Sequence, residues 1–278
     1  MKKRTELPRL AAAGQEVPAV WLTDEVREAR RLSAAGACVV FVLTPQNRDA
    51  DIFDIPYCTE LQPDWDKLVP KGHTAGFLTE YLEKVWQRSR GLPWHILDTP
   101  RLRVREMTAE DLDALYALHS DPDMEQFADG LLPDRDAERT RLEAYIRHMY
   151  GFYEFGIWLV TLRAKAAGTD SSGQTETIIG RAGLQLREGF DSPELGFAIA
   201  APYRGQGYAF EVCRAVLQYG FEELELPEIR AVVHRDNRKS LGLCAKLGFT
   251  VDNTAVFPDG MWTGLVIRKQ KAESGCEA

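Results

Sequence analysis

Apolar runs and helix-period patterns divide the chain into alternating strands and helices. Before residue 97, "PAVWL" and "ACVVFVL" predict two buried strands, the second of a kind typical of parallel sheets covered on both faces. Between them, "TDEVREARRLSAAG" has helical spacing, with Thr23 or Asp24 as cap and Gly36 as stop. "TAGFLTEYLEKVWQRSRG" predicts a later helix. We therefore expect a βαβ-like unit in a small three-layer α/β domain.

A different order of elements follows "RGLPWHILDTPRL", a stretch with two prolines and a glycine. "RLRVREM" predicts a strand and "TAEDLDALYALHS" a helix, with Thr108 and Asp111 at capping-box spacing. A second helix, three strands, a helix, a strand, a short helix and final strands come next. We place a domain boundary at about residue 97. This gives a flexible N-terminal tail over residues 1–18, an accessory α/β domain over 19–97 and a second domain over 98–278.

The glycines in "APYRGQGYAFEV" interrupt this pattern between an apolar strand and an amphipathic helix. A helix N-terminus offers unpaired N–H groups and the positive end of the helix dipole. Glycines ahead of it let the main chain approach an anion, and an arginine adds charge. The sequence therefore predicts a site for a phosphate or pyrophosphate, although such a turn can also serve only to redirect the chain.

Composition and charge narrow the classes of function. The 278 residues are 45% hydrophobic and 27% charged, as in soluble globular proteins, and the net charge of -8 argues against a nucleic-acid binder. No apolar run is long enough for a membrane span. The five cysteines are odd in number and form no CxxC, which argues against a disulfide framework or a metal site and favours a reducing cytoplasm.

Two motifs in order resemble those of the GCN5-related N-acetyltransferases (GNAT). "RGQGYA" matches their Q/R-x-x-G-x-G/A motif, and "NRKSLGLCAKLGF" is similar to a second family segment downstream. "RLRVREMTAEDLDAL" resembles the family's first strand and helix. The resemblance covers about residues 98–270 and is nearest to the ribosomal-protein N-acetyltransferase-like branch. It implies a GNAT fold: a mixed, mostly antiparallel sheet, flanked by helices, whose fourth and fifth strands splay apart.

The resemblance also implies a cosubstrate and the residues that bind it. Family members transfer an acetyl group from acetyl-CoA directly to a primary amine, of a small molecule or of a peptide or protein N-terminus. In this sequence the pantetheine arm would bond the main chain of the fourth strand at Phe197, Ala198 and Ile199, with Asn237 close to it unless that residue only caps a helix. The pyrophosphate would lie on the amides of Arg204, Gly205, Gln206, Gly207, Tyr208 and Ala209.

Acetyl transfer needs a base and a proton donor. Glu194 begins the fourth strand, where many relatives carry a carboxylate, and two-residue alternation puts it on one face with Gly196 and Ala198. We predict that Glu194 is the base; the alternative is a solvated strand-end residue. Cys244 stands where relatives carry a tyrosine, so it is a candidate proton donor. Its alternative is a small buried side chain, with the proton coming from water.

The remaining candidates have weaker support. His234 ends a strand, and Glu125, Glu188 and Asp191 are candidate anchors for a cationic amine, although charged loop residues are usually solvated. Residues 19–97 show no D-x-D nucleophile motif, P-loop or dinucleotide fingerprint, so an accessory or dimerising module is expected, with a homodimer as one arrangement. The alternative to an enzyme is a non-catalytic acyl-CoA-binding sensor.

Overall fold

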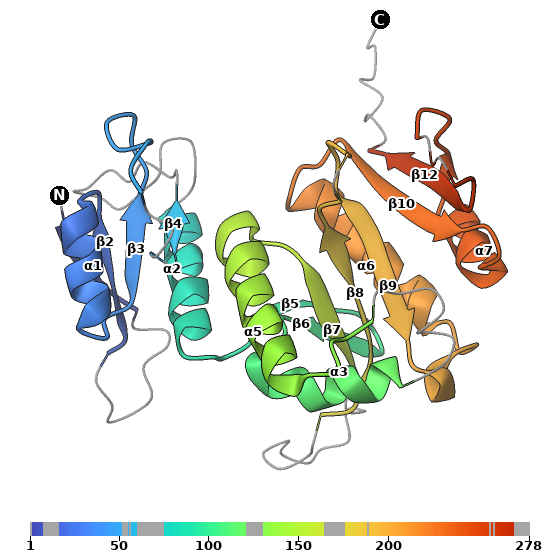
Figure 1. The fold of residues 1–278 in the computed structure, drawn as a ribbon, viewed down its shortest axis with the longest axis horizontal. Helices are drawn as coiled ribbons and strands as arrows, with labels where there is room; N and C mark the ends of the chain where they lie inside the picture. Colours follow the sequence, from blue (N-terminus) through green and yellow to red (C-terminus); the bar gives the residue numbers. More distant parts are fainter. Residues whose placement is uncertain are drawn as a thin grey trace, which may run out of the picture. The chain divides into compact units, whose positions relative to one another are not determined.

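The computed structural model describes residues 2–7, 17–51, 55, 57–59, 75–120, 130–163, 176–187, 189–255, 257 and 259–269 (Figure 1). The chain forms two compact units, and each unit consists of two chain segments. The first unit is Met1–Trp94 with Arg139–Glu154, and the second is His95–Glu138 with Phe155–Ala278. The division into residues 1–18, 19–97 and 98–278 stays a prediction.

The first unit contains a four-stranded sheet in the order β1-β2-β3-β4. β2, β3 and β4 are parallel, and β1 is antiparallel to β2. β2, helix α1 and β3 thus form the predicted βαβ unit. The elements are β1 (Lys2–Glu6), β2 (Ala19–Thr23), α1 (Val26–Ala34), β3 (Val39–Val42), β4 (Cys58–Thr59) and α2 (Ala75–Ser89).

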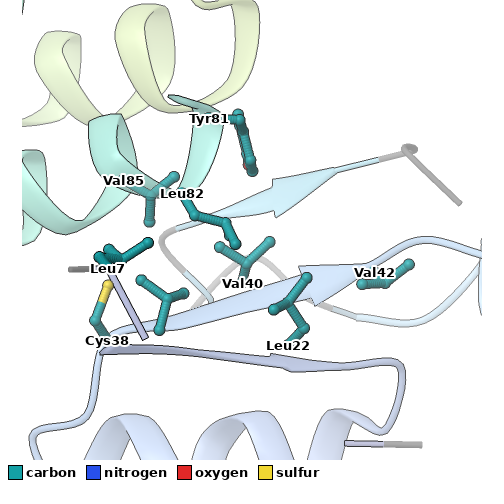
Figure 2. Close-up of a cluster of buried hydrophobic side chains, with 9 residues drawn as sticks. Leu7, Leu22, Cys38, Val40, Val42, Tyr81, Leu82 and Val85 are labelled. Carbon is teal, nitrogen blue, oxygen red and sulfur yellow. The ribbon is translucent and has the colours of Figure 1, made fainter. Parts of the chain in front are cut away.

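Alternate side chains of this sheet enter two separate cores. On one face, Val20, Leu22 and Val40 pack with Leu82 and Val85 of α2, which Figure 2 shows pointing at the sheet. On the other face, the core contains Ala29 and Leu32 of α1 with Val39 and Phe41 of β3. A sheet with a helix on each face confirms the three-layer prediction.

Strand β1 lies where we expected a flexible tail. Its five residues pair one to one with β2, from Lys2 opposite Thr23 to Glu6 opposite Ala19. Leu7, which follows directly, is fully buried and anchors the strand end. The strand "KKRTE" has no apolar residue, so main-chain hydrogen bonds rather than side-chain burial stabilise it.

The second unit contains an eight-stranded sheet in the order β11-β12-β10-β9-β8-β7-β6-β5. Every neighbouring pair is antiparallel except β9 and β10, which are parallel. This mixed, mostly antiparallel sheet flanked by helices confirms the predicted fold. The strands are β5 (His95–Asp98), β6 (Leu102–Arg105), β7 (Ile157–Leu162), β8 (Ile178–Gln185), β9 (Glu194–Ile199), β10 (Glu228–His234), β11 (Thr250–Val251) and β12 (Trp262–Arg268).

Helices follow the predicted order along the chain, and their bounds complete the description. They are the short 3-10 helix η2 (Ala109–Asp111), α3 (Leu112–His119), α5 (Arg135–Tyr145), the π-helix η3 (Ile146–Tyr153), the 3-10 turn η4 (Ala201–Tyr203), α6 (Tyr208–Glu222) and α7 (Arg238–Lys246). None of the helices within the described ranges has the length and apolar character needed to cross a membrane.

Asp111 joins the start of η2 to strand β6. Its carboxylate accepts a hydrogen bond from the N–H of Thr108 (2.7 Å), as the capping-box spacing predicted. The same carboxylate bonds the guanidinium of Arg105 at two points, Nη1–Oδ2 at 2.9 Å and Nη2–Oδ1 at 2.8 Å. Both side chains are almost buried, so this ion pair fixes the first helical turn on the sheet.

The sheet is tightest at two glycines of β8. A Cβ on Gly183 would lie 2.0 Å from the carbonyl oxygen of Gly156, and one on Gly180 would lie 2.3 Å from that of Ala198. Real side chains do not approach main chain so closely, so both positions require glycine.

Candidate active site

Strand β9 is paired along its whole length on one side and at a single position on the other. Each of its six residues pairs with β8. With β10, the pairing among the described residues is limited to Glu194 and Arg230, next to a hydrogen bond from the N–H of Arg230 to the carbonyl of Pro193 (2.9 Å). Beyond this point the two strands part, as Figure 1 shows. They are the splayed pair that the family resemblance implies.

The register of β9 fixes which main-chain groups point toward β10. The N–H of Ala200 donates to the carbonyl of Ile179 (2.9 Å), so Ala200 and Ile179 form a hydrogen-bonded pair of the antiparallel ladder. Because such pairs alternate with non-hydrogen-bonded ones, Ala198 also bonds β8, whereas Phe197 and Ile199 direct N–H and C=O toward β10. Two of the three predicted pantetheine residues therefore present main-chain groups where the strands separate.

The turn between β9 and α6 presents main-chain N–H groups at the surface. Gly205 and Gly207 are exposed and have φ of +74° and +83°, a region that other residues rarely adopt. Gly207 is the N-cap of α6, and no side chain caps this end of the helix. Unpaired N–H groups at the positive end of a helix dipole can bind an anion.

The two polar side chains of this turn bond the turn itself. Nε of Arg204 donates to the carbonyl of Ile199 (2.8 Å), and Nε2 of Gln206 donates to the carbonyl of Pro202 (3.1 Å). Both hydrogen bonds shape the turn. The groups best placed for a ligand are thus the main-chain amides up to Tyr208 and Ala209, the first residues of α6.

Glu194 is a buried carboxylate in an ion pair. It is 5% exposed, and its two oxygens bond the guanidinium of Arg187 on the connection that leaves β8, Nη2–Oε1 at 3.3 Å and Nε–Oε2 closer. The pair lies beside the point where β9 and β10 begin to part. Glu194 is therefore not the solvated strand-end residue of the alternative interpretation.

Asn237 and Cys244 both belong to α7 and its start. Oδ1 of Asn237 accepts a hydrogen bond from the N–H of Ser240 (3.0 Å), so Asn237 caps the helix. Cys244 is fully buried, and this burial raises the pKa of its thiol to about 11. A thiol in this environment stays protonated at neutral pH and does not face solvent, which favours the packing interpretation of Cys244.

The structure describes two of the four remaining candidate residues, His234 and Asp191. Nδ1 of His234 accepts a hydrogen bond from the N–H of Asp236 (3.2 Å), and the ring lies edge-on to Trp262 with centroids 5.2 Å apart. Asp191 is exposed. Glu125 and Glu188 lie outside the described residues.

Three residues that were not predicted from the sequence bond one another at the start of α6. Glu211, in the first turn of α6, accepts hydrogen bonds from Oγ1 of Thr99 (2.6 Å) and Nε of Arg101 (2.6 Å), more than 100 positions earlier. A carboxylate in the first turn of a helix that binds phosphate would repel its ligand unless a cation offsets it. That conflict is the signal in the sequence that could have prompted a search for a partner arginine.

Among the residues placed by the structure, no group of three His, Cys, Asp or Glu side chains could hold a metal ion. The residues that converge near the parted strands are instead main-chain donors, one buried ion pair and a helix N-terminus. Such a set suits a ligand that carries phosphate groups.

Comparisons with known proteins agree with this arrangement. Residues 101–250, more than half of the chain, match the family model described as "Acetyltransferase (GNAT) domain". The uncharacterized N-acetyltransferase YoaA of Bacillus subtilis is 30% identical over 155 residues, which cover 55% of this chain and 82% of that protein. The putative ribosomal N-acetyltransferase YdaF of the same organism is 33% identical over 76 residues, covering 26% and 42%.

A solved structure supports the fold. The acetyltransferase from Agrobacterium tumefaciens str. C58 superposes with a TM-score of 0.51 at 24% identity, covering 62% of this chain and 94% of that one.

Proposed function

The chain belongs to the GNAT acetyltransferase family, and we propose that it transfers the acetyl group of acetyl-CoA to a primary amine of a small molecule or of a peptide or protein N-terminus. The protein is an acetyltransferase of the GNAT type, and enzymes of this type use acetyl-CoA. The acceptor and the roles of individual residues are the proposal. The observation that carries it is the parting of β9 and β10 directly ahead of the uncapped N-terminus of α6.

The described residues fit acetyl-CoA in two places. The amides from Arg204 to Ala209, with Gly205 and Gly207 in the left-handed region, would hold the diphosphate. The main chain of Phe197 and the N–H of Ile199 would hold the pantetheine arm, since the carbonyl of Ile199 accepts from Arg204 and the main chain of Ala198 is bonded to β8. Asn237 caps α7 with its oxygen, and we propose that its amide group contacts the same arm.

Acetyl-CoA, when bound, supplies an activated acetyl thioester. The N–H of Phe197 points toward β10, where no strand pairing of the described residues engages it, so we propose that it stabilises the negative charge that develops on the thioester oxygen. Donors that are fixed in a sheet need no reorganisation during the reaction, which is why a strand N–H suits this role.

Glu194 is the proposed base. An ammonium has no lone pair, so the acceptor must lose a proton before attack, directly or through water. The Arg187 guanidinium bonds both oxygens of Glu194, and an incoming cationic amine would compete with it for them. Cys244 stays the named candidate for the proton donor, but its complete burial supports water as the source of that proton.

The accessory role of residues 19–97 is part of the proposal. The sheet that they form with β1 is covered by α1 on one face and α2 on the other. We propose that this module supports the acetyltransferase rather than adding a second reaction.

An acceptor panel tests the proposal. The full-length protein is incubated with acetyl-CoA and with polyamines, amino sugars or peptides with free N-termini, and free thiol is measured. Glu194→Gln should lose activity most strongly near neutral pH and approach the parent at high pH, where the acceptor deprotonates on its own. Glu222→Gln, at the far end of α6 and bonded to Gln218, is the matched control and should behave as the parent.

Thiol release, measured together with acetyl-CoA binding, distinguishes an enzyme from a non-catalytic sensor. Tight binding of acetyl-CoA without thiol release for any acceptor would reject the proposed transfer. If Glu194→Gln matches the parent at every pH, Glu194 is not the base.

A further inference from the structure

Arg101, between β5 and β6, contacts the turn at the start of α6 in three ways. Its Nε donates to Oε2 of Glu211 (2.6 Å), and its Nη1 donates to the carbonyl of Gln206 (3.0 Å). Its guanidinium lies over the ring of Tyr208, with Cζ 4.3 Å from the centroid. Arg101 belongs to neither of the two family motifs, and it is 105 positions before Gln206.

The hydrogen bond to Gln206 sets the direction of one peptide group. In a trans peptide the C=O and the next N–H point in opposite directions. Since Nη1 of Arg101 holds the carbonyl of Gln206, the N–H of Gly207 points away from the guanidinium. Gly207 is the N-cap of α6, so this N–H is one of those that form the anion site.

Glu211 keeps Arg101 in place. Its Oε1 accepts hydrogen bonds from Oγ1 of Thr99 (2.6 Å) and from the N–H of Arg101 (3.0 Å), while Oε2 takes Nε of Arg101. Partial burial alone would raise the pKa of Glu211, but the hydrogen bonds from Thr99 and Arg101 lower it below its ordinary value. Glu211 is therefore charged at neutral pH, and without Arg101 its charge would stand uncompensated in the first turn of α6.

We propose that Arg101 is a positioning residue for the diphosphate of acetyl-CoA: it orients the Gly207 N–H toward the ligand and neutralises Glu211 beside it. This inference rests on the proposed acetyl-CoA site. The competing interpretation is that Arg101 only ties β6 to α6, as a structural ion pair. The two differ in one respect, because a structural tie serves every acyl donor equally, whereas a diphosphate role matters only for donors that carry a diphosphate.

Two acyl donors separate these interpretations. Acetyl-CoA carries the diphosphate, and S-acetylpantetheine presents the same thioester without it. In the full-length protein we expect Arg101→Met to raise the KM for acetyl-CoA about tenfold, because the Gly207 N–H loses its orientation and the charge of Glu211 is no longer offset, with kcat close to the parent. For S-acetylpantetheine we expect kcat/KM to stay within about twofold of the parent.

Arg103→Met is the matched control. Arg103 lies two residues further along the chain, within β6, is half exposed and pairs with Asp98 (3.2 Å) rather than with the turn. It should leave both donors unaffected. If Arg101→Met does not fold, Arg101→Lys, which keeps the charge but cannot form the same fork of hydrogen bonds, undergoes the same comparison.

Equal losses for both donors, or an unchanged KM for acetyl-CoA, would overturn the inference. Calorimetric titration with CoA separates this failure from that of the proposed function. If the parent protein binds CoA but releases no thiol, the proposed transfer is wrong. In that case weaker binding of CoA by Arg101→Met than by the parent still supports the role of Arg101. Equal binding of CoA by the two proteins rejects that role. A parent that does not bind CoA contradicts both. If the variant loses affinity for CoA but not for 3′-dephospho-CoA, the assignment to the diphosphate is wrong.

Discussion

Arg187 and Glu194 form a two-point ion pair in which one partner is buried and the other is not. The Glu194 side chain is 6% exposed, whereas that of Arg187 is 40% exposed. The carboxylate depends on the guanidinium for its hydrogen bonds, but the guanidinium can turn to solvent. Removing Arg187 should therefore lower the stability of the protein more than removing the charge of Glu194.

We expect Arg187→Met to reduce the free energy of unfolding by about 2 kcal/mol, because it leaves a buried carboxylate unpaired. Glu194→Gln should cost about 1 kcal/mol or less, because Arg187 can be solvated. Denaturant unfolding of both variants measures the difference. Equal losses of unfolding free energy in the two variants would contradict this difference between the partners.

The ion pair of Arg105 and Asp111 predicts a pH dependence of stability. Burial alone would raise the pKa of Asp111, but hydrogen bonds from Arg105 and Thr108 lower it below its ordinary value. A carboxyl whose pKa is lowered on folding contributes stability above its unfolded pKa of about 4, and this contribution is lost as the pH falls through the folded pKa.

Asp111→Asn should therefore lower stability by about 2 kcal/mol at pH 7, and the difference from the parent should shrink steadily below about pH 4. Thermal unfolding of both proteins across this range provides the measurement. A difference that does not change with pH would contradict the assignment.

Glycine substitutions test the close packing of β8. Gly183→Ala places a Cβ 2.0 Å from the carbonyl oxygen of Gly156, so we expect a loss of about 2 to 4 kcal/mol. Gly242→Ala, inside α7, meets no atom within 4 Å and should stabilise the protein by about 0.5 to 1 kcal/mol. Chemical denaturation compares the two, and a tolerated Gly183→Ala would show that the strand can shift.

The burial of Cys244 predicts the outcome of its removal. Cys244→Ala should change kcat by less than about threefold and cost about 1 kcal/mol of stability through lost packing. In the folded parent, Cys244 should resist thiol reagents, because burial raises its pKa to about 11. A loss of two or more orders of magnitude in kcat with unchanged stability would instead identify Cys244 as the proton donor.

Local features could be predicted from the sequence. The capping spacing of Thr108 and Asp111, the left-handed glycines ahead of α6 and the βαβ unit each depend on neighbouring residues whose chemistry dictates the conformation. The motif around Gly207 then identified the family and its sheet.

Distant pairings could not be predicted. Nothing near Glu211 indicates that its partners are Thr99 and Arg101, because that contact depends on how α6 packs against the end of β6. The pairing of Arg187 with Glu194 depends on the connection between two strands. Strand β1 escaped notice because a strand held by main-chain bonds leaves no hydrophobic pattern.

The first compact unit takes residues 139–154 from the middle of the family segment as well as the N-terminal residues. The polypeptide therefore leaves that unit after Trp94, returns to it at Arg139 and leaves it again after Glu154, so a cut near residue 97 would separate two segments of the same unit. A truncated acetyltransferase that starts there would lose the packing partners of Arg139–Glu154. We therefore expect heating to melt the protein in one cooperative transition rather than two.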